Sequence, residues 1–189
     1  MIDELKNIEY VLFDLDGTVS DSSEGITKSA DKALKSEGIN VPFETLTSFI
    51  GPALRVSFGR YTDDVEKRDR MLDVYRERYS EKGWCENKIY PGMAELLRDL
   101  QKSGKHVVLA SAKPEYFCRK IIKYFGVEQY FDFIGGSDME GKRDDKTVLL
   151  TYVLDNIGNP RSDKIVMIGD RKFDLSLIHI SEPTRHSLI

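Results

Sequence analysis

The sequence predicts an α/β fold: a doubly wound parallel sheet with a Rossmann-like core and an inserted all-helical cap. Two observations predict this class. Four short, almost continuous apolar runs have the length and pattern of strands buried on both faces. They alternate with stretches whose apolar residues recur at helical spacing, an order that implies parallel strands joined by right-handed crossovers.

The elements of the core follow in order along the chain. The expected strands are residues 10–14, 106–110, 130–134 and 164–168. The expected helices are residues 91–102, 114–124 and 146–157. Two of these helices begin at a proline, which suits the first helical turn because it has no N–H group to leave unpaired. Each helix therefore lies between two strands of the predicted sheet.

The segment after the first strand breaks this alternation. Helical patterns cover residues 24–37, 46–50, 54–61 and 63–79, and no convincing strand run interrupts them. Gly38 marks the end of the first of these helices. We therefore expect a catalytic core of residues 1–20 and 90–174 and a helical cap of residues 21–89. Residues 20–22 and 90–92 are the expected hinge strands between them.

Composition and charge narrow the classes of function. Hydrophobic residues make up 40% of the chain and charged residues 32%, the balance of an ordinary globular protein. The formal net charge of -4 argues against nucleic acid as a partner, since binding phosphate backbones requires clustered Lys and Arg. The polar N-terminus does not resemble a secretory signal, and no apolar run is long enough to cross a bilayer. With two widely spaced cysteines, we expect reduced thiols and a cytoplasmic protein without membrane contact; the oligomeric state stays unknown.

The strongest chemical signal is the string Asp14-Leu15-Asp16-Gly17-Thr18 at the end of the first strand run. Ligands of open α/β sheets bind beyond the carboxyl ends of the strands. Gly17 supplies backbone freedom where the chain leaves the strand. A carboxylate at position 14 can attack phosphorus, while a second carboxyl group at position 16 can protonate a leaving oxygen and later activate water.

Residues 13–19, Phe-Asp-Leu-Asp-Gly-Thr-Val, resemble the first motif of the haloacid dehalogenase superfamily in its phosphatase branch. Three further features match that family in order. Ser111 resembles the hydroxyl of the second motif, Lys146 the lysine of the third, and residues 169–174, Gly-Asp-Arg-Lys-Phe-Asp, the acidic fourth motif. Lys113 and Lys142 compete with Lys146 for the role of the motif lysine. The whole chain looks closest to the phosphoglycolate phosphatase-like subgroup, some members of which are nucleotidases.

This resemblance implies a magnesium-dependent phosphatase that hydrolyses a small phosphorylated metabolite through an aspartyl-phosphate. Asp14, Asp16 and Lys146 would be the catalytic residues. The implied Mg²⁺ ligands are Asp14, the backbone carbonyl of Asp16, Asp170 and, in an outer position or through water, Asp174. The implied substrate-binding residues are Thr18, Ser111, Ala112 and, from a cap loop at residues 49–54, Arg55.

Two rival functions share parts of this pattern. Sugar phosphomutases of the β-phosphoglucomutase type contain all four motifs and differ in the cap residues that hold the sugar. Receiver domains of signalling pairs also place a phospho-accepting Asp at a strand end, but they are binding switches. The helical insert and the Asp-x-Asp-Gly-Thr string argue against a receiver domain.

Residues 175–189 differ in character from the rest of the chain. Pro183 and the mixed apolar and polar residues form neither the helix nor the strand that such a core needs next. The string from Leu175 to Arg185 resembles the translation of a sequencing-library adapter. We therefore expect residues 175–189 to be non-native and a further C-terminal strand of the natural protein to be missing.

Overall fold

The computed structural model describes residues 7–138, 142–143 and 145–169. The two predicted metal-binding acids of the fourth motif, Asp170 and Asp174, and the tail of residues 175–189 lie outside these residues. The chain divides into two compact units, residues 1–18 with 91–189 and residues 19–90. We call them the sheet unit and the helical unit. Their roles as catalytic core and cap stay predictions.

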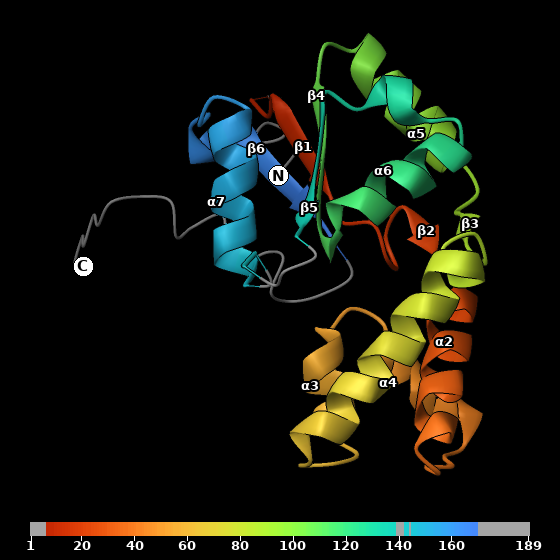
Figure 1. Ribbon diagram of the computed structural model, residues 1–189. Coiled ribbons are helices and arrows are strands. Elements are labelled where there is room, and N and C mark those ends of the chain that lie inside the picture. The colour runs from red at the N-terminus through yellow and green to blue at the C-terminus, as the bar shows by residue number, and fades with distance from the viewer. Residues whose placement is uncertain (1–6, 139–141, 144, 170–189) are drawn as a thin grey trace, which may run out of the picture. The chain divides into compact units, whose positions relative to one another are not determined.

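The sheet unit contains a four-stranded parallel sheet of order β5-β4-β1-β6 (Figure 1). Its strands are β1 (Tyr10–Phe13), β4 (His106–Pro114), β5 (Phe133–Ser137) and β6 (Ile165–Ile168). In register, Phe13 of β1 lies opposite Leu109 of β4 on one side and Ile168 of β6 on the other. The carboxyl end of β1 therefore opens between two neighbouring strands that run the same way. This sheet confirms the predicted α/β class.

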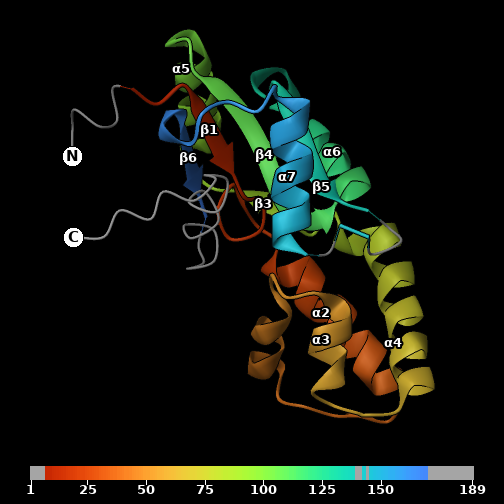
Figure 2. The ribbon, with the colours of Figure 1, turned by 90° about the vertical axis from the view of Figure 1, so that its left-hand side faces the viewer.

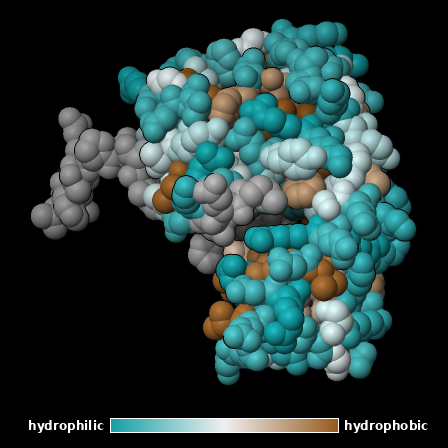
Figure 3. Space-filling view, viewed as in Figure 1, coloured by the Kyte–Doolittle hydropathy of each residue, from teal (hydrophilic) through white to brown (hydrophobic). Residues whose placement is uncertain are grey.

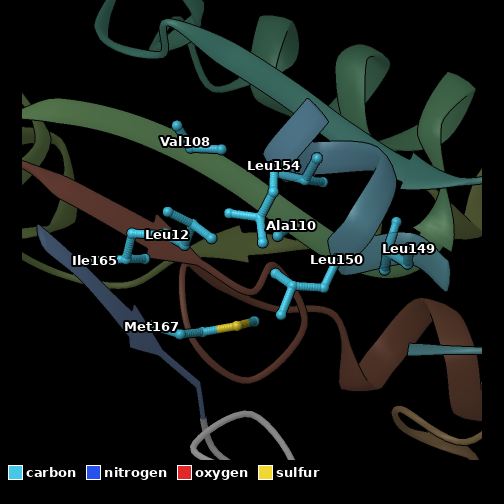
Figure 4. Close-up of a cluster of buried hydrophobic side chains, with 9 residues drawn as sticks. Leu12, Val108, Ala110, Leu149, Leu150, Leu154, Ile165 and Met167 are labelled. Carbon is cyan, nitrogen blue, oxygen red and sulfur yellow. The ribbon is translucent and has the colours of Figure 1, made fainter. Parts of the chain in front are cut away.

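Helices cover both faces of that sheet. Helix α7 (Lys146–Asn156) lies on one face, and α5 (Met93–Lys102) and α6 (Glu115–Tyr124) lie on the other (Figures 1 and 2). Short 3₁₀ turns, η3 (Glu128–Tyr130) and η4 (Ser162–Lys164), precede β5 and β6. Under α7, apolar side chains alternate inward from the strands and meet the leucines of the helix (Figure 4). This cluster comprises Leu12, Val108, Ala110, Leu149, Leu150, Val153, Leu154, Ile165 and Met167.

Two predictions for the sheet unit differ from the structure, the position of one strand and the position of Ser111. The strand expected at residues 130–134 forms at Phe133–Ser137, because residues 128–130 make a 3₁₀ turn and the carboxylate of Asp132 accepts the N–H of Val107 at 3.0 Å. Ser111, expected just beyond its strand, lies inside β4. Both differences arise because β4 and β5 pair beyond the apolar runs from which the strands were predicted, as far as Pro114 and Ser137.

The helical unit consists mainly of helices, with one short antiparallel pair of strands. Its elements are β2 (Ser20–Asp21), α2 (Ser23–Ser36), the 3₁₀ helix η1 (Phe43–Phe49), α3 (Leu54–Gly59), α4 (Val65–Arg78), the π-helix η2 (Tyr79–Gly83) and β3 (Lys88–Ile89). At the two ends of this unit β2 pairs with β3. β2 lies within residues 20–22, where the first hinge strand was expected, and β3 lies just before residues 90–92, where the second was expected. Their role as hinges stays a prediction.

Helix α2 packs against α4, η1 and η2 within the helical unit. It comes near η2 at Gly25, where an added Cβ atom would collide with the backbone carbonyl of Gly83. Nearby, Arg78 donates to both carboxylate oxygens of Glu86, at 2.8 and 3.0 Å, and to the hydroxyl of Ser29 at 3.1 Å. The helices are thus held by direct backbone contact and by a well-bonded ion pair.

On the surface, hydrophilic residues predominate over the face shown in Figure 3, and hydrophobic residues there lie in separate places. The large hydrophobic side chains that are exposed belong to both units. They are Phe43, Val56, Val65, Tyr90, Leu96, Tyr116, Tyr124, Val148 and Ile168. Among the described residues, none of the helices combines the length and the apolar character that crossing a membrane requires.

Candidate active site

The site begins where β1 ends, at Asp14. The backbone N–H of Asp14 donates to the carbonyl of Ile168 at 3.0 Å, which continues the pairing of β1 with β6 by one residue. The carboxylate oxygen Oδ1 of Asp14 accepts the N–H of Leu15 at 2.8 Å. Gly17 then adopts a φ of 81°, and the N–H of Thr18 donates to the carbonyl of Leu15 at 3.3 Å. Asp16 therefore lies in a tight turn directly after the carboxyl end of β1.

Asp16 forms a buried ion pair with Lys113. The ammonium Nζ of Lys113 lies 2.9 Å from Oδ2 of Asp16, and the two side chains are only 7% and 10% exposed. Lys113 belongs to β4, which lies beside β1 in the sheet. The pair therefore joins the ends of two neighbouring strands. The structure thus places Lys113, one of the cations competing for the role of Lys146, on the second acid of the motif.

Two buried oxygen atoms at this site have no hydrogen-bond partner among the described residues. They are Oδ1 of Asp16 and the hydroxyl oxygen of Thr18. A buried polar atom without a partner costs free energy, so such atoms persist where a ligand, water or ion completes them. Both belong to the string of residues 14–18 that the sequence singled out.

Ser111 and Ala112 lie on the same strand as Lys113. Ser111 is buried, and its hydroxyl accepts the N–H of Lys113 at 3.4 Å. The pairing of β4 with β5 shifts register between Ser111 and Pro114, so β4 carries extra residues there. Because Phe13 lies opposite Leu109, Ser111 and Asp14 share one edge of the sheet. The predicted binding of substrate phosphate by Ser111 and Ala112 stays a prediction.

Lys146 opens α7. Asp145 caps the helix, since its Oδ1 accepts the N–H groups of Thr147 at 2.8 Å and Val148 at 3.2 Å. The competing Lys142 lies in a turn, where its backbone N–H donates to Asp138 at 2.9 Å. Lys146 thus has a fixed backbone at the start of a helix that packs on the sheet. Its role toward Asp14 stays a prediction.

The remaining predicted residues belong to the helical unit or lie outside the described residues. Arg55 belongs to α3 of the helical unit, where its guanidinium pairs with Asp69 at 2.5 Å, and its role toward the substrate stays a prediction. Asp170 and Asp174 lie outside the described residues. Among the described residues, no cluster of three His, Cys, Asp or Glu side chains could hold a metal ion. The donor chemistry that is described fits Mg²⁺, because the carboxylate of Asp14 and the carbonyl of Asp16 are the hard oxygen ligands that this ion prefers.

Sequence reasoning missed the residues that support the site. Glu115 accepts Arg119 through Oε1, at 2.9 and 3.0 Å, and the hydroxyl of Tyr152 through Oε2, at 3.1 Å, which ties α6 to α7. Cys118 lies fully buried below the loop, and its thiol donates to the carbonyl of Lys113 at 3.4 Å. Burial raises the pKa of this thiol far above its usual value, which disfavours the thiolate in the folded protein. Lys113 was named from the sequence only as a competitor of Lys146, and its contact with Asp16 was not predicted.

Comparison with known proteins places the chain in a family. The model of the haloacid dehalogenase-like hydrolase family matches residues 11–177. A protein of Pseudomonas aeruginosa named 5'-nucleotidase is 39% identical over 167 residues, which cover 87% of this chain and 75% of that protein. A crystal structure from Clostridium acetobutylicum, described as a predicted phosphatase, is 42% identical with a TM-score of 0.83, covering 88% of this chain and 78% of that one.

A further relative differs in its name and length. Tyrosine-protein kinase PtkA of Mycobacterium tuberculosis is 36% identical over 168 residues, which cover 88% of this chain. The chain spans only 57% of the length of that relative. The match of the family model covers the four motifs and most of the chain. This protein belongs to the haloacid dehalogenase-like hydrolase family.

Proposed function

We propose that the chain is a magnesium-dependent phosphatase of small phosphomonoesters that works through an aspartyl-phosphate on Asp14. The observation that carries this proposal is the pair of acids at the end of β1. Asp14 is half-buried, and Asp16 is held by Lys113 through Oδ2 while its Oδ1 has no hydrogen-bond partner among the described residues. Two carboxyl groups in different surroundings are the arrangement expected of a nucleophile beside an acid.

In the first half of the reaction, a carboxylate oxygen of Asp14 attacks phosphorus. A bond forms between that oxygen and phosphorus, and the bond from phosphorus to the ester oxygen breaks. Asp16 gives its proton to the departing oxygen, which leaves as an alcohol. The product on the protein is an aspartyl-phosphate at position 14.

In the second half, water replaces the carboxylate. Asp16 takes a proton from the water as its oxygen bonds to phosphorus, and the bond to Asp14 breaks to release inorganic phosphate. Ser111 and Thr18 are the hydroxyl groups that would bind phosphate oxygens, and Lys146 would neutralise their charge. Mg²⁺, when held by Asp14, the carbonyl of Asp16 and Asp170, supplies positive charge that offsets the repulsion between the nucleophile and an anionic substrate.

The substrate we propose is a phosphoglycolate-like ester or a nucleoside monophosphate. The name of the Pseudomonas aeruginosa relative supports nucleoside 5'-monophosphates as the first class to assay. Selection of the alcohol portion would fall to the helical unit, including Arg55. We propose that this unit acts as the cap of the family.

The test is release of inorganic phosphate by the 189-residue chain from a panel of phosphomonoesters, with and without Mg²⁺. Replacing the nucleophile, Asp14→Asn, is expected to lower kcat/KM by at least ~10³-fold, because a carboxamide cannot form the acyl-phosphate bond. The folded state should be unchanged, as judged by circular dichroism. Retained magnesium-dependent turnover in this variant would refute the assignment of Asp14.

The same assay separates the rival functions. Conversion of a sugar 1-phosphate to its isomer without phosphate release would indicate a phosphomutase. A long-lived phosphoaspartate without turnover would indicate a receiver-like switch. Because one relative is named a tyrosine-protein kinase, the panel also includes ATP with a tyrosine-containing protein, and transfer to tyrosine without ester hydrolysis would overturn the phosphatase proposal.

A further inference from the structure

We propose that Lys113 is the positioning residue of Asp16, which it holds through Oδ2 so that Oδ1 faces the reacting oxygen. The inference rests on the proposed function and adds a residue to it. It assigns Lys113 a task in proton transfer, distinct from binding the substrate phosphate. The carboxyl group of Asp16 is thus positioned by Lys113 of β4, and not by Asp14 or by Asp16 itself.

The geometry of the pair supports this task. Nζ of Lys113 lies 2.9 Å from Oδ2 of Asp16, and both side chains are almost fully buried. A buried charge keeps its partner, because separating the two would leave each one unpaired in a medium that solvates it poorly. The contact therefore restricts the carboxyl group of Asp16 to one orientation, as an ion pair when Asp16 is ionised and as a hydrogen bond from the ammonium to Oδ2 when Oδ1 carries the proton.

The backbone of Lys113 is itself fixed from both sides. Its N–H donates to the hydroxyl of Ser111 at 3.4 Å, and its carbonyl accepts the thiol of Cys118 at 3.4 Å. The next residue, Pro114, has a φ of -53° and leads directly into α6. The lysine thus reaches Asp16 from an anchored base, as positioning requires.

Donor and acceptor roles then identify the working oxygen. An ammonium group has only donors, so a proton on Oδ2 would face another donor. The proton that Asp16 gives and takes therefore belongs on Oδ1. That oxygen is buried and has no partner among the described residues, which leaves it for the leaving group and for water.

The test uses two substrates with different leaving groups. Hydrolysis of an alkyl phosphate from the panel requires protonation of its poor leaving group. The p-nitrophenolate group of p-nitrophenyl phosphate is a good leaving group and needs protonation far less. In Lys113→Met, kcat for the alkyl ester should fall ~10²-fold, kcat for the aryl ester only ~3-fold, and both KM values should change less than ~2-fold. The matched control is Lys123→Met, which removes an exposed lysine from α6, the helix that follows Lys113. Its kcat and KM values should equal those of the wild type.

A double mutant provides the second readout. If Lys113 acts only through Asp16, then Lys113→Met in an Asp16→Asn background should cost less than ~3-fold more in kcat for the alkyl ester, against the ~10²-fold loss expected in the wild-type background. The double variant replaces a buried ion pair by neutral groups, so it keeps the test available should the single lysine variant fail to fold. Thermal melts of all variants accompany the kinetics.

The outcomes separate the inference from the proposed function. Equal losses with both esters, a raised KM, or an undiminished loss in the Asp16→Asn background would overturn the inference and place Lys113 on the phosphate. A uniform loss that follows the melting temperature would reduce it to a structural pair, which also overturns the inference. A wild-type chain that melts cooperatively, and is therefore folded, yet releases no phosphate from any ester refutes the proposed function first.

Discussion

The two units each contain an ion pair with little exposure, and the two pairs differ in how completely they are bonded. In the helical unit, Arg78 engages both oxygens of Glu86, and Lys28 lies 3.5 Å from the same carboxylate. In the sheet unit, Lys113 engages one oxygen of Asp16 and leaves the other buried without a described partner. The first pair is complete, as a purely structural contact should be. The second keeps an acceptor open, which a reaction can use.

Two intrinsic probes allow the units to be followed separately. Trp84, the single tryptophan, lies in the helical unit, and the buried Cys118 lies in the sheet unit. Tryptophan fluorescence therefore reports on the helical unit, and protection of the thiol from alkylation reports on the sheet unit. Three substitutions, in decreasing order of expected effect, test the comparison.

The largest effect is expected from Leu12→Ala, which removes the support of the sheet unit's pair. Leu12 is fully buried in the cluster between β1 and α7. Truncating a leucine in such a core costs about 3–5 kcal/mol in free energy of unfolding, since the lost burial adds to the cavity left behind. Alkylation of Cys118 should accelerate strongly. An unchanged alkylation rate would show that the two strands of the site do not depend on this core.

The next effect is expected from Gly25→Ala, which acts on the helical unit. The added methyl group would collide with the backbone of Gly83, and the backbone N–H of Gly25 donates to the carbonyl of Glu86 at 3.1 Å. Forcing these segments apart should cost about 1–3 kcal/mol, with a lower midpoint in tryptophan fluorescence. Gly59→Ala is the control, because its nearest neighbour is the flexible end of Arg68. Equal midpoints for both variants would contradict the close contact.

The smallest effect is expected from Glu86→Gln, and it should depend on pH. The hydrogen bonds and charge of Arg78 hold the pKa of Glu86 below its ordinary value of 4.5. A lowered pKa in the folded state stabilises the protein above pH 4.5, and that stabilisation is lost as the pH falls through the folded-state value. The variant should be less stable by about 1–2 kcal/mol at pH 7, with the difference shrinking below pH 4.5 in urea titrations. A difference independent of pH would exclude the ion pair as its source.

The sequence predicted the sheet well where a strand is apolar throughout. The runs around Leu12 and Val108 are buried on both sides, so their pattern alone identifies them. The strand β5 was misplaced because it contains Gly135 and Gly136, residues that weaken a strand signal. A Cβ atom at Gly136 would lie 2.6 Å from the backbone of Glu115, so tertiary packing, not strand propensity, selects glycine there.

For the site too, local features could be predicted from the sequence and tertiary contacts could not. Asp14 and Asp16 could be predicted because they follow directly on one strand and form a motif by themselves. The contact of Asp16 with Lys113 could not, since it joins residues that lie far apart in the chain and depends on a local shift in the pairing of β4. The links of Glu115 with Arg119 and Tyr152 also depend on how two helices pack. Contacts between side chains that are distant in the chain produce no regular spacing in the sequence from which they could be predicted.

The register shift between Ser111 and Pro114 has a consequence for engineering. Because β4 carries surplus residues over this short stretch, its length there is decoupled from the length of β5. A redesign that changes residues 111–114 therefore alters β4 at the bulge without changing the length of β5. Because Lys113 lies within this stretch, deleting a residue there would change the position of its ammonium group relative to Asp16.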